Sequence, residues 1–179
     1  MDELVDILDE NGNYTGKTAM KSEAHKLGLF HPTIHVWCYS KRGKVLLQQR
    51  GANKDANPLK WDVSVAGHIG AGESPEIGAL REVKEEIGVT IDLKDLEKID
   101  VLKKEKRYSA SFFDREFTHT FLYMLSEDTP LTKQESEVEA LEWVTLQDFQ
   151  ELVVQDDSQL VPNSRDRYQQ IIKMIASRL

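Results

Sequence analysis

The chain has 179 residues, of which 40% are hydrophobic and 30% are charged. This apolar content suffices for an ordinary core at this length, and no long block of one charge sign occurs, so the composition indicates a globular protein. The formal net charge of -8 argues against general binding of a nucleic-acid polymer, because a phosphate backbone requires clustered Lys and Arg. Phosphates can still bind if a divalent cation lies between them and protein carboxylates.

The sequence also indicates where the protein works. Cys38 is the single cysteine, which excludes a disulfide within the chain and is compatible with a reducing compartment. The acidic first ten residues lack the basic and then apolar pattern of a secretion signal. No apolar run approaches the roughly 20 residues that span a bilayer. We expect a cytoplasmic protein with no membrane partner, either a monomer or a homodimer.

The first thirty residues predict a small extension packed on a main domain formed by residues 31–179. Leu4–Leu8 is typical of a strand, and Asn11-Gly12-Asn13 indicates the turn of a β-hairpin. Thr18–Leu27 has helical composition and ends before Gly28, a plausible helix stop. The extension should therefore contain a hairpin and one helix.

The main domain mixes strands and helices along the chain. Hydrophobic patterning predicts six strands, at Thr33–Tyr39, Lys44–Gln49, Trp61–Ile69, Val101–Tyr108, Glu116–Leu125 and Ala140–Val144. Residues 51–60 are polar and indicate a loop. Besides the helix discussed next, two further helices are predicted at Thr145–Val153 and Asn163–Leu179. This order favours the α/β (α+β) class, with helices packed on a central sheet.

The clearest predicted helix follows Ser74. Ser74 is a good N-cap, Pro75 suits the first helical position, and Gly88 is a typical C-cap. Its apolar residues recur at helical spacing and should face the core, namely Ile77, Leu80, Val83 and Ile87.

The same helix places three carboxylates on one face. Glu82, Glu85 and Glu86 have the spacing i, i+3 and i+4. Three neighbouring carboxylates repel one another, and a bound divalent cation with oxygen preference offsets that repulsion. The alternative is a solvated acidic face balanced by Arg81 and Lys84, which is common on surface helices rich in Glu.

The wider pattern favours the metal. Seven positions match one signature, namely Gly67, Glu73, Arg81, Glu82, Glu85, Glu86 and Gly88. At average residue usage, seven fixed positions occur by chance on the order of once in 10⁸ starting points. The segment from Gly67 to Val89 therefore resembles the signature of the Nudix hydrolases.

This resemblance implies both a fold and a chemistry. Nudix enzymes have a mixed β-sheet sandwiched between helices, and they hydrolyse a diphosphate linked to another group. The resemblance implies that Mg²⁺, with Mn²⁺ as a substitute, is the cofactor, and that a small-molecule diphosphate, such as a nucleoside diphosphate derivative, is the substrate. We expect the glycines of the signature to let the backbone turn sharply near the phosphates.

The resemblance also assigns roles to residues. Glu82, Glu85 and Glu86 would bind the metal, and one of them would deprotonate the attacking water. The backbone carbonyl of Ala66 would join them as a ligand. Glu73 and Arg81 would orient the carboxylates through charge-assisted hydrogen bonds.

Residues 23–73 resemble a narrower branch, which includes isopentenyl-diphosphate isomerase and its hydrolase relatives. His25, His31, His68 and Glu116 match the metal ligands of the isomerase, with Asp114 a looser match. These histidines would form a second metal site.

Ala66 departs from the isomerase, which has its catalytic cysteine at that position. Proton transfer at an alkene carbon needs a positioned acid and base, so Ala66 favours hydrolysis. An isomerase-like enzyme and a non-catalytic ligand-binding module remain the alternatives.

Several further side chains are candidates for substrate binding, each with an ordinary structural alternative. Arg50 is a candidate for binding the substrate phosphate, and Lys54 is a weaker candidate for the same role. Glu137 lies where many Nudix enzymes have an additional acid, although a solvated loop glutamate fits equally well. The complete predicted substrate-binding set is Arg50, His68, Glu116, His119 and Glu137. The sequence does not choose the substrate, because specificity lies outside the signature.

Overall fold

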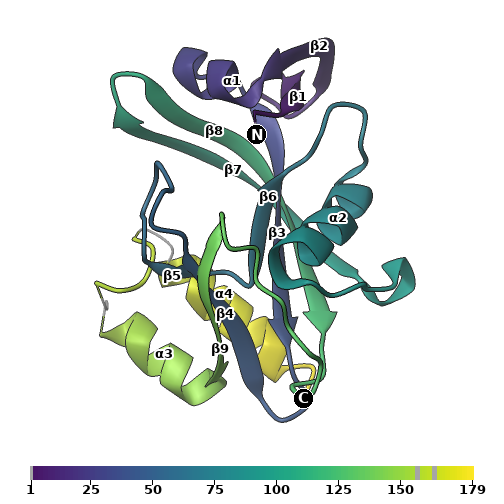
Figure 1. Cartoon of the computed structure of the whole chain (residues 1–179), viewed down its shortest axis with the longest axis vertical. Helices are drawn as coiled ribbons and strands as arrows, with labels where there is room; N and C mark the ends of the chain where they lie inside the picture. The colour runs from purple at the N-terminus through teal and green to yellow at the C-terminus, as the bar shows by residue number, and fades with distance from the viewer. Residues whose placement is uncertain (1, 156–157, 163–164) are drawn as a thin grey trace.

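The computed structural model describes residues 2–155, 158–162 and 165–179 (Figure 1). The strands are β1 (Leu4–Leu8), β2 (Tyr14–Met20), β3 (His31–Tyr39), β4 (Lys44–Arg50), β5 (Trp61–Asp62), β6 (Val65–His68), β7 (Glu97–Ser109), β8 (Phe112–Met124) and β9 (Val138–Thr145). The helices are α1 (Lys21–Leu27), α2 (Pro75–Ile87), α3 (Leu146–Val154) and α4 (Arg165–Ala176), with a short 3₁₀ helix at Leu93–Asp95. None of the described helices has the length and apolarity that a membrane crossing requires.

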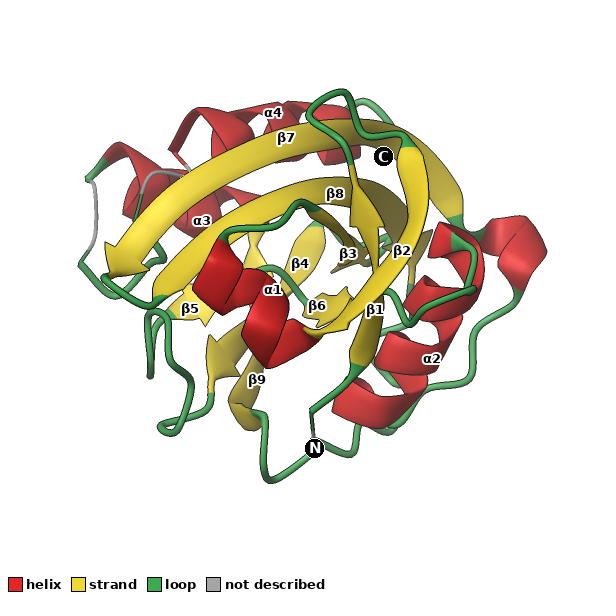
Figure 2. Ribbon diagram, turned by 90° about the horizontal axis from the view of Figure 1, so that it is seen from above, coloured by secondary structure: helices red, strands yellow, loops and turns green. Residues whose placement is uncertain are grey.

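The main sheet is mixed and lies between helices. Its strands run in the order β5-β4-β3-β8-β7, while β6 pairs with β3 and β9 pairs with β4. The β3 and β8 strands are parallel, and the other pairs are antiparallel. Helix α2 lies on one side of the sheet, whereas α3 and α4 lie on the other (Figure 2). The predicted α+β class and the mixed sheet between helices are confirmed.

Both faces of the central strand β3 are buried. Ile34 and Val36 belong to the cluster that packs on Val83 and Ile87 of α2. Trp37 belongs to the second cluster, which packs on α3 and α4. Side chains of a strand alternate between its two faces, so β3 joins the two halves of the core.

The N-terminal hairpin and α1 lie across one end of the main sheet (Figures 1 and 2). Hydrogen bonds fasten β1 there, from the Leu8 amide to the Phe30 carbonyl at 2.7 Å and from the Ala71 amide to the Leu4 carbonyl at 2.9 Å. Val5 and Ala24 form a small apolar cluster of their own. The hairpin is therefore tied both to the start of β3 and to the loop that follows β6.

Two predicted elements are corrected by the structure. The predicted helix Thr18–Leu27 begins only at Lys21, because Thr18 and Ala19 pair with β1 in the hairpin. Pairing with a neighbouring strand outweighs the local helical preference of these residues.

The predicted strand Trp61–Ile69 is interrupted at Ser64. The Ser64 hydroxyl donates to the Leu46 carbonyl at 2.5 Å and accepts from the Cys38 amide at 2.8 Å. It takes part in two hydrogen bonds to backbone groups, so β5 pairs with β4 while β6 pairs with β3.

Several strands are longer than predicted, among them β7 and β8, and one helix has an undescribed start. The β7 and β8 strands each have 13 residues and form a long antiparallel pair. The predicted final helix began at Asn163, but residues 163–164 lie outside the described part of the chain. Its described portion is α4.

We predict that Gly88→Ala lowers the free energy of unfolding more than Gly16→Ala. Both glycines have left-handed backbones, with φ of 74° and 75°, so both substitutions incur a strain of about 1–2 kcal/mol. A Cβ at Gly88 would also lie 2.8 Å from Cβ of Thr132, whereas no described atom lies within 4 Å of one at Gly16. Overpacking should add roughly 1–3 kcal/mol at Gly88. Urea denaturation measures the difference, and equal losses at the two sites would contradict the prediction.

Candidate active site

Helix α2 is fixed at both ends as the sequence predicts. The Ser74 hydroxyl accepts a hydrogen bond from the Ile77 amide at 3.3 Å, and Pro75 occupies the first turn. At the other end, the Gly88 amide bonds to the Lys84 carbonyl at 3.2 Å. These caps satisfy backbone groups that a helix leaves unpaired, and they define where the helix begins and ends.

Gly67 allows the Glu82 carboxylate to lie against β6. A Cβ built at Gly67 would lie 2.1 Å from Cδ of Glu82, which no real contact permits. Gly67 lies in a strand, so its role is to leave space for a carboxylate. The expectation that it makes a sharp turn is wrong, whereas Gly72 has a φ of 80° and does turn the loop before α2.

Glu86 is the most deeply buried of the three carboxylates, with 2% of its surface exposed. Its Oε2 accepts hydrogen bonds from Nε2 of Gln48 at 2.8 Å and from the Ala66 amide at 3.2 Å. Burial raises the pKa of Glu86 to about 7. Burial, followed by the charge of Glu86, likewise raises the pKa of Glu82 to about 7, and Glu85 is 45% exposed. Two carboxylates are therefore held close together at a high energetic cost.

Arg81 connects the carboxylates of the signature. Its Nε and Nη2 donate to the two oxygens of Glu73, each at 3.0 Å. Its Nη1 donates to Glu82 at 2.8 Å and to Glu85 at 3.3 Å, and Nη2 also reaches the His68 carbonyl at 2.9 Å. The guanidinium of Arg81 holds the pKa of Glu73 below its usual value. Arg81 thereby holds three carboxylates and the end of β6 in place.

Three histidines gather beside this site. His25 comes from α1, His31 from β3 and His68 from β6, and one ring nitrogen of each lies within 4.8 Å of the other two. Nε2 of His25 and Nε2 of His68 are 3.3 Å apart. Burial lowers the pKa of His31 to about 4 and that of His68 well below its usual value. Neutral imidazole is the form that binds metals.

Carboxylates and one lysine adjoin the histidines. Nε2 of His31 lies 3.9 Å from Glu116, and Nδ1 of His25 lies 3.4 Å from Asp114. Lys104 lies 2.8 Å from Asp114 and 3.7 Å from Glu116. Burial raises the pKa of Glu116 to about 7, against the charge of Lys104. The structure thus gathers every residue that the isomerase resemblance implied for a second site.

Two of the predicted substrate-binding residues have other surroundings. Nε of Arg50 donates to the Ala56 carbonyl at 3.0 Å, and Nη1 lies 3.7 Å from Asp62, so Arg50 braces the loop that follows it. His119 shares a face of β8 with Phe121, which packs in the α2 cluster. Glu116 is on the opposite face of β8, so His119 lies on the α2 side of the sheet and not in the group of His25, His31 and His68.

Glu137 belongs to the loop that precedes β9. Its carboxylate forms an ion pair with Lys54, and its backbone carbonyl accepts from the Gly51 amide at 2.8 Å. In the same loop, the Gln134 amide donates to the Glu86 carbonyl at 3.0 Å. The structure therefore brings the loop of Glu137 to α2, as the prediction for this residue requires.

Sequence reasoning missed Gln48 and Lys104. Gln48 is 3% exposed, directly after the apolar residues Val45–Leu47 of β4, and its side chain donates to Glu86. A polar side chain at a buried strand position was the available signal, because buried polar groups need partners. Lys104 lies in a strand of alternating charges, where nothing in the sequence distinguishes it from its exposed neighbours.

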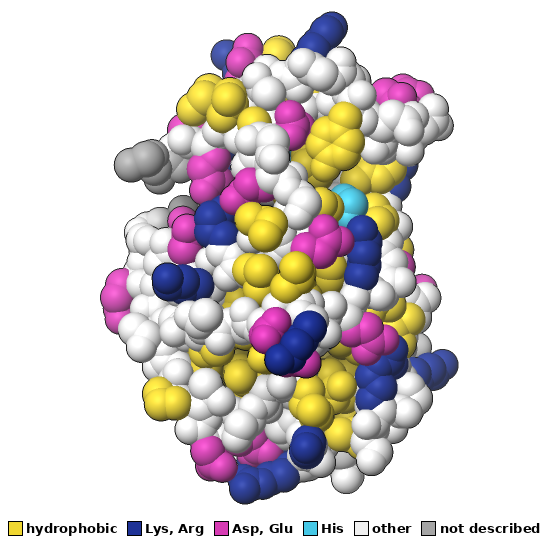
Figure 3. Space-filling model, turned by 90° about the vertical axis from the view of Figure 1, so that its right-hand side faces the viewer, with side chains coloured by type: hydrophobic (Ala, Val, Ile, Leu, Met, Phe, Trp, Pro, Cys, Tyr) yellow, Lys and Arg dark blue, Asp and Glu magenta, His cyan; other side chains and the backbone are white. Residues whose placement is uncertain are grey.

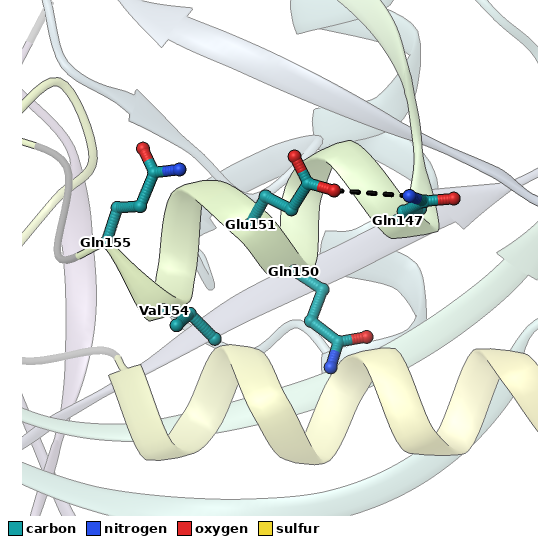
Figure 4. A pocket seen from close by; sticks show the side chains of 5 residues that line it. All are labelled: Gln147, Gln150, Glu151, Val154 and Gln155. Atoms are coloured by element: carbon teal, nitrogen blue, oxygen red, sulfur yellow. Dashed lines mark hydrogen bonds between the residues drawn. The ribbon is translucent and has the colours of Figure 1, made fainter.

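The outer surface adds little to this site. A hollow on α3 is lined by Gln147, Gln150, Glu151, Val154 and Gln155, away from α2 (Figures 1 and 4). On the face that contains α2, acidic, basic and apolar side chains are interspersed (Figure 3). The Lys and Arg side chains visible there do not gather into one patch.

Comparison with known proteins agrees with the geometry. The model of the family described as NUDIX domain matches residues 29–164. Nudix hydrolase 3 of Arabidopsis thaliana is 34% identical over 166 residues, which are 90% of this chain and 22% of that protein. An uncharacterized Nudix hydrolase of Clostridium acetobutylicum is 38% identical over 78% of this chain and 68% of its own. The isopentenyl-diphosphate Delta-isomerase of Streptomyces avermitilis is 31% identical over 86% of this chain and 76% of its own.

Solved structures share the fold. DR0079 from Deinococcus radiodurans superposes with a TM-score of 0.71 at 17% identity, covering 94% of this chain and 98% of its own. The NUDIX domain of Shewanella oneidensis NrtR, solved with ADP ribose, has a TM-score of 0.58 at 20% identity, covering 82% of this chain and 86% of its own. With the signature residues gathered along β6, α2 and the loop between them, and the family model matching residues 29–164, the chain belongs to the Nudix family.

Proposed function

We propose that this chain is a magnesium-dependent hydrolase that cleaves the diphosphate bond of a nucleoside diphosphate derivative or a related small diphosphate. The supporting observation is the pair of buried carboxylates, Glu82 and Glu86, packed against β6. The NUDIX domain solved with ADP ribose supports a substrate in which a diphosphate links two larger groups.

The residues present fit a divalent cation. Burial raises the pKa of both Glu82 and Glu86, the charge of Glu86 adds to the shift at Glu82, and Arg81 offsets the shift at Glu82 only in part. Mg²⁺ and Mn²⁺ prefer carboxylate oxygens and would remove this repulsion. Glu82, Glu85, Glu86 and the Ala66 carbonyl would hold the ion, and Glu137 would contribute the additional acid.

The bound ion would neutralise the diphosphate and lower the pKa of a coordinated water. The protein supplies the other parts of the reaction. One of the three carboxylates of α2 accepts the proton of the attacking water. Gln48 holds Glu86 in place through a hydrogen bond of 2.8 Å, while Arg81 and Glu73 fix Glu82 and the end of β6.

Isomerisation is disfavoured by the positions of Ala66 and Cys38. Ala66 has no acidic or nucleophilic group where the isomerase has a cysteine. Cys38 cannot replace it, because its side chain lies in the α2-side core and burial raises its pKa to about 12. A non-catalytic module is disfavoured too, because ligand binding alone does not explain three retained carboxylates.

The histidine cluster supports a second metal site. His25, His31 and His68 offer three imidazole nitrogens, and Glu116 adds a carboxylate at 3.9 Å from His31. This mixed nitrogen and oxygen set suits Mn²⁺, Zn²⁺ or another transition metal better than Mg²⁺. The two sites share His68, whose backbone carbonyl bonds Arg81.

Glu86→Gln should lose most of the turnover while it remains folded, because the amide keeps the shape but not the charge that holds the metal. The assay is a magnesium-dependent screen of nucleoside diphosphates, dinucleotide polyphosphates, nucleotide sugars, ADP-ribose, coenzyme A and isopentenyl diphosphate, with products identified. Near-wild-type rates in the variant would refute the role of Glu86. Conversion of isopentenyl diphosphate to its isomer would favour the isomerase instead.

The same variant should become more stable than the wild type as the pH rises. Burial raises the pKa of Glu86 from 4.5 to about 7, so folded wild-type protein retains a proton that the unfolded chain releases. Its free energy of unfolding therefore declines between pH 4.5 and 7, whereas Gln is unaffected. In chelator, Glu86→Gln should gain on the order of 1–3 kcal/mol relative to wild type between pH 5 and 8. A constant difference in urea denaturation would contradict this.

His25→Gln should remove one tightly bound transition metal per chain. The change deletes an imidazole from the histidine cluster without touching the carboxylates of α2. Metal analysis after dialysis against Mn²⁺ or Zn²⁺ measures the stoichiometry. His119→Gln is the control, since His119 lies on the other face of β8. An unchanged stoichiometry in His25→Gln would exclude the second site.

A further inference from the structure

Lys54 belongs to the loop between β4 and β5 and has no role in the mechanism above. That loop is anchored beside Glu137, because the Gly51 amide bonds the Glu137 carbonyl at 2.8 Å. The approach is so close that a Cβ at Gly51 would lie 2.9 Å from the same carbonyl. The Lys54 amide in turn bonds the Gly51 carbonyl at 3.2 Å. The backbone at Lys54 is therefore fixed next to Glu137.

The side chain of Lys54 completes this contact. Its ammonium pairs with the Glu137 carboxylate, and the two side chains are 25% and 37% exposed. Glu137 is close to α2 in its turn, because the Gln134 amide binds the Glu86 carbonyl and the Val138 amide binds the Gln134 carbonyl. The charge of Lys54 acts on the Glu86 carboxylate and on His68. Lys54 thus lies beside the carboxylate site and within electrostatic reach of the histidine cluster.

We propose that Lys54 is an exchangeable counter-ion. It neutralises Glu137 until a divalent metal binds, and its ammonium then forms an ion pair with the diphosphate of the substrate instead. This inference rests on the proposed function, because it assigns Glu137 to the metal. It makes Lys54 a binding residue for the phosphate and a competitor of the metal.

The energetics of the contact permit the exchange. A partly exposed ion pair contributes little to stability, so a divalent ion with two charges readily displaces one ammonium. The lysine stem has four carbons and rotates freely, while the loop backbone stays anchored through Gly51. The released ammonium therefore remains near the metal, where the anionic substrate must lie.

Lys54→Met should tighten the binding of the metal and weaken the binding of the diphosphate. Loss of the competing ammonium should tighten Mn²⁺ binding, measured by electron paramagnetic resonance, roughly two- to fivefold. Inorganic pyrophosphate should bind the Mn²⁺-saturated variant several-fold more weakly in calorimetry. A purely structural role for Lys54 would weaken both. Lys60→Met is the matched control, because Lys60 lies in the same loop and bonds the Ser158 carbonyl; it should change neither affinity.

Two further variants complete the test. Lys54→Arg keeps the charge and should bind pyrophosphate nearly as the wild type does. In a Glu137→Gln background, Lys54→Met should no longer tighten Mn²⁺ binding, because the pair has already been broken. Unchanged or weaker Mn²⁺ binding in Lys54→Met would overturn the exchange, and unchanged pyrophosphate binding would overturn the second role of Lys54. Both measurements are of binding, so they are independent of whether any diphosphate is hydrolysed.

Discussion

Two carboxylates on α2 approach a strand closely enough that the strand needs a glycine at the contact. Glu82 occupies the space that a side chain at Gly67 would fill, and Glu86 bonds the amide of Ala66 one residue earlier. Burial raises the pKa of both carboxyl groups to about 7. The surroundings follow from this constraint, since Arg81 offsets the charge of Glu82 and Gln48 binds Glu86. The site stores repulsion that a divalent cation is suited to relieve.

Local signals in the sequence predicted much of this arrangement. Ser74, Pro75 and Gly88 defined α2 because helix ends depend on side-chain caps and on left-handed backbone. The spacing of Glu82, Glu85 and Glu86 predicted a shared face, since it depends only on helical geometry. His25, His31 and His68 came from a resemblance, and three separate elements bring them together.

Tertiary contacts account for what the sequence did not predict. Ser64 ended one strand early because its hydroxyl bonds two backbone groups from neighbouring strands. Thr18 and Ala19 joined a strand because β1 was available as a partner. His119 lies on the face of β8 opposite Glu116, which alternation alone could not relate to α2, and its role in substrate binding stays a prediction. Lys104 and Asp114 became partners only through the long pairing of β7 with β8.

The N-terminal segment contributes one imidazole to the histidine cluster. His25 lies on α1, ahead of the residues that the family model matches, yet its ring is 3.3 Å from His68 at the edge of the signature. A shortened protein that started at β3 would keep every signature residue and lose one imidazole. If the histidine cluster binds an ion, docking of the N-terminal segment and occupancy of the cluster are linked equilibria. An ion bound to the three histidines would stabilise the docking of α1 on the main domain. Protection of the α1 amides from hydrogen exchange would therefore report that the ion is bound.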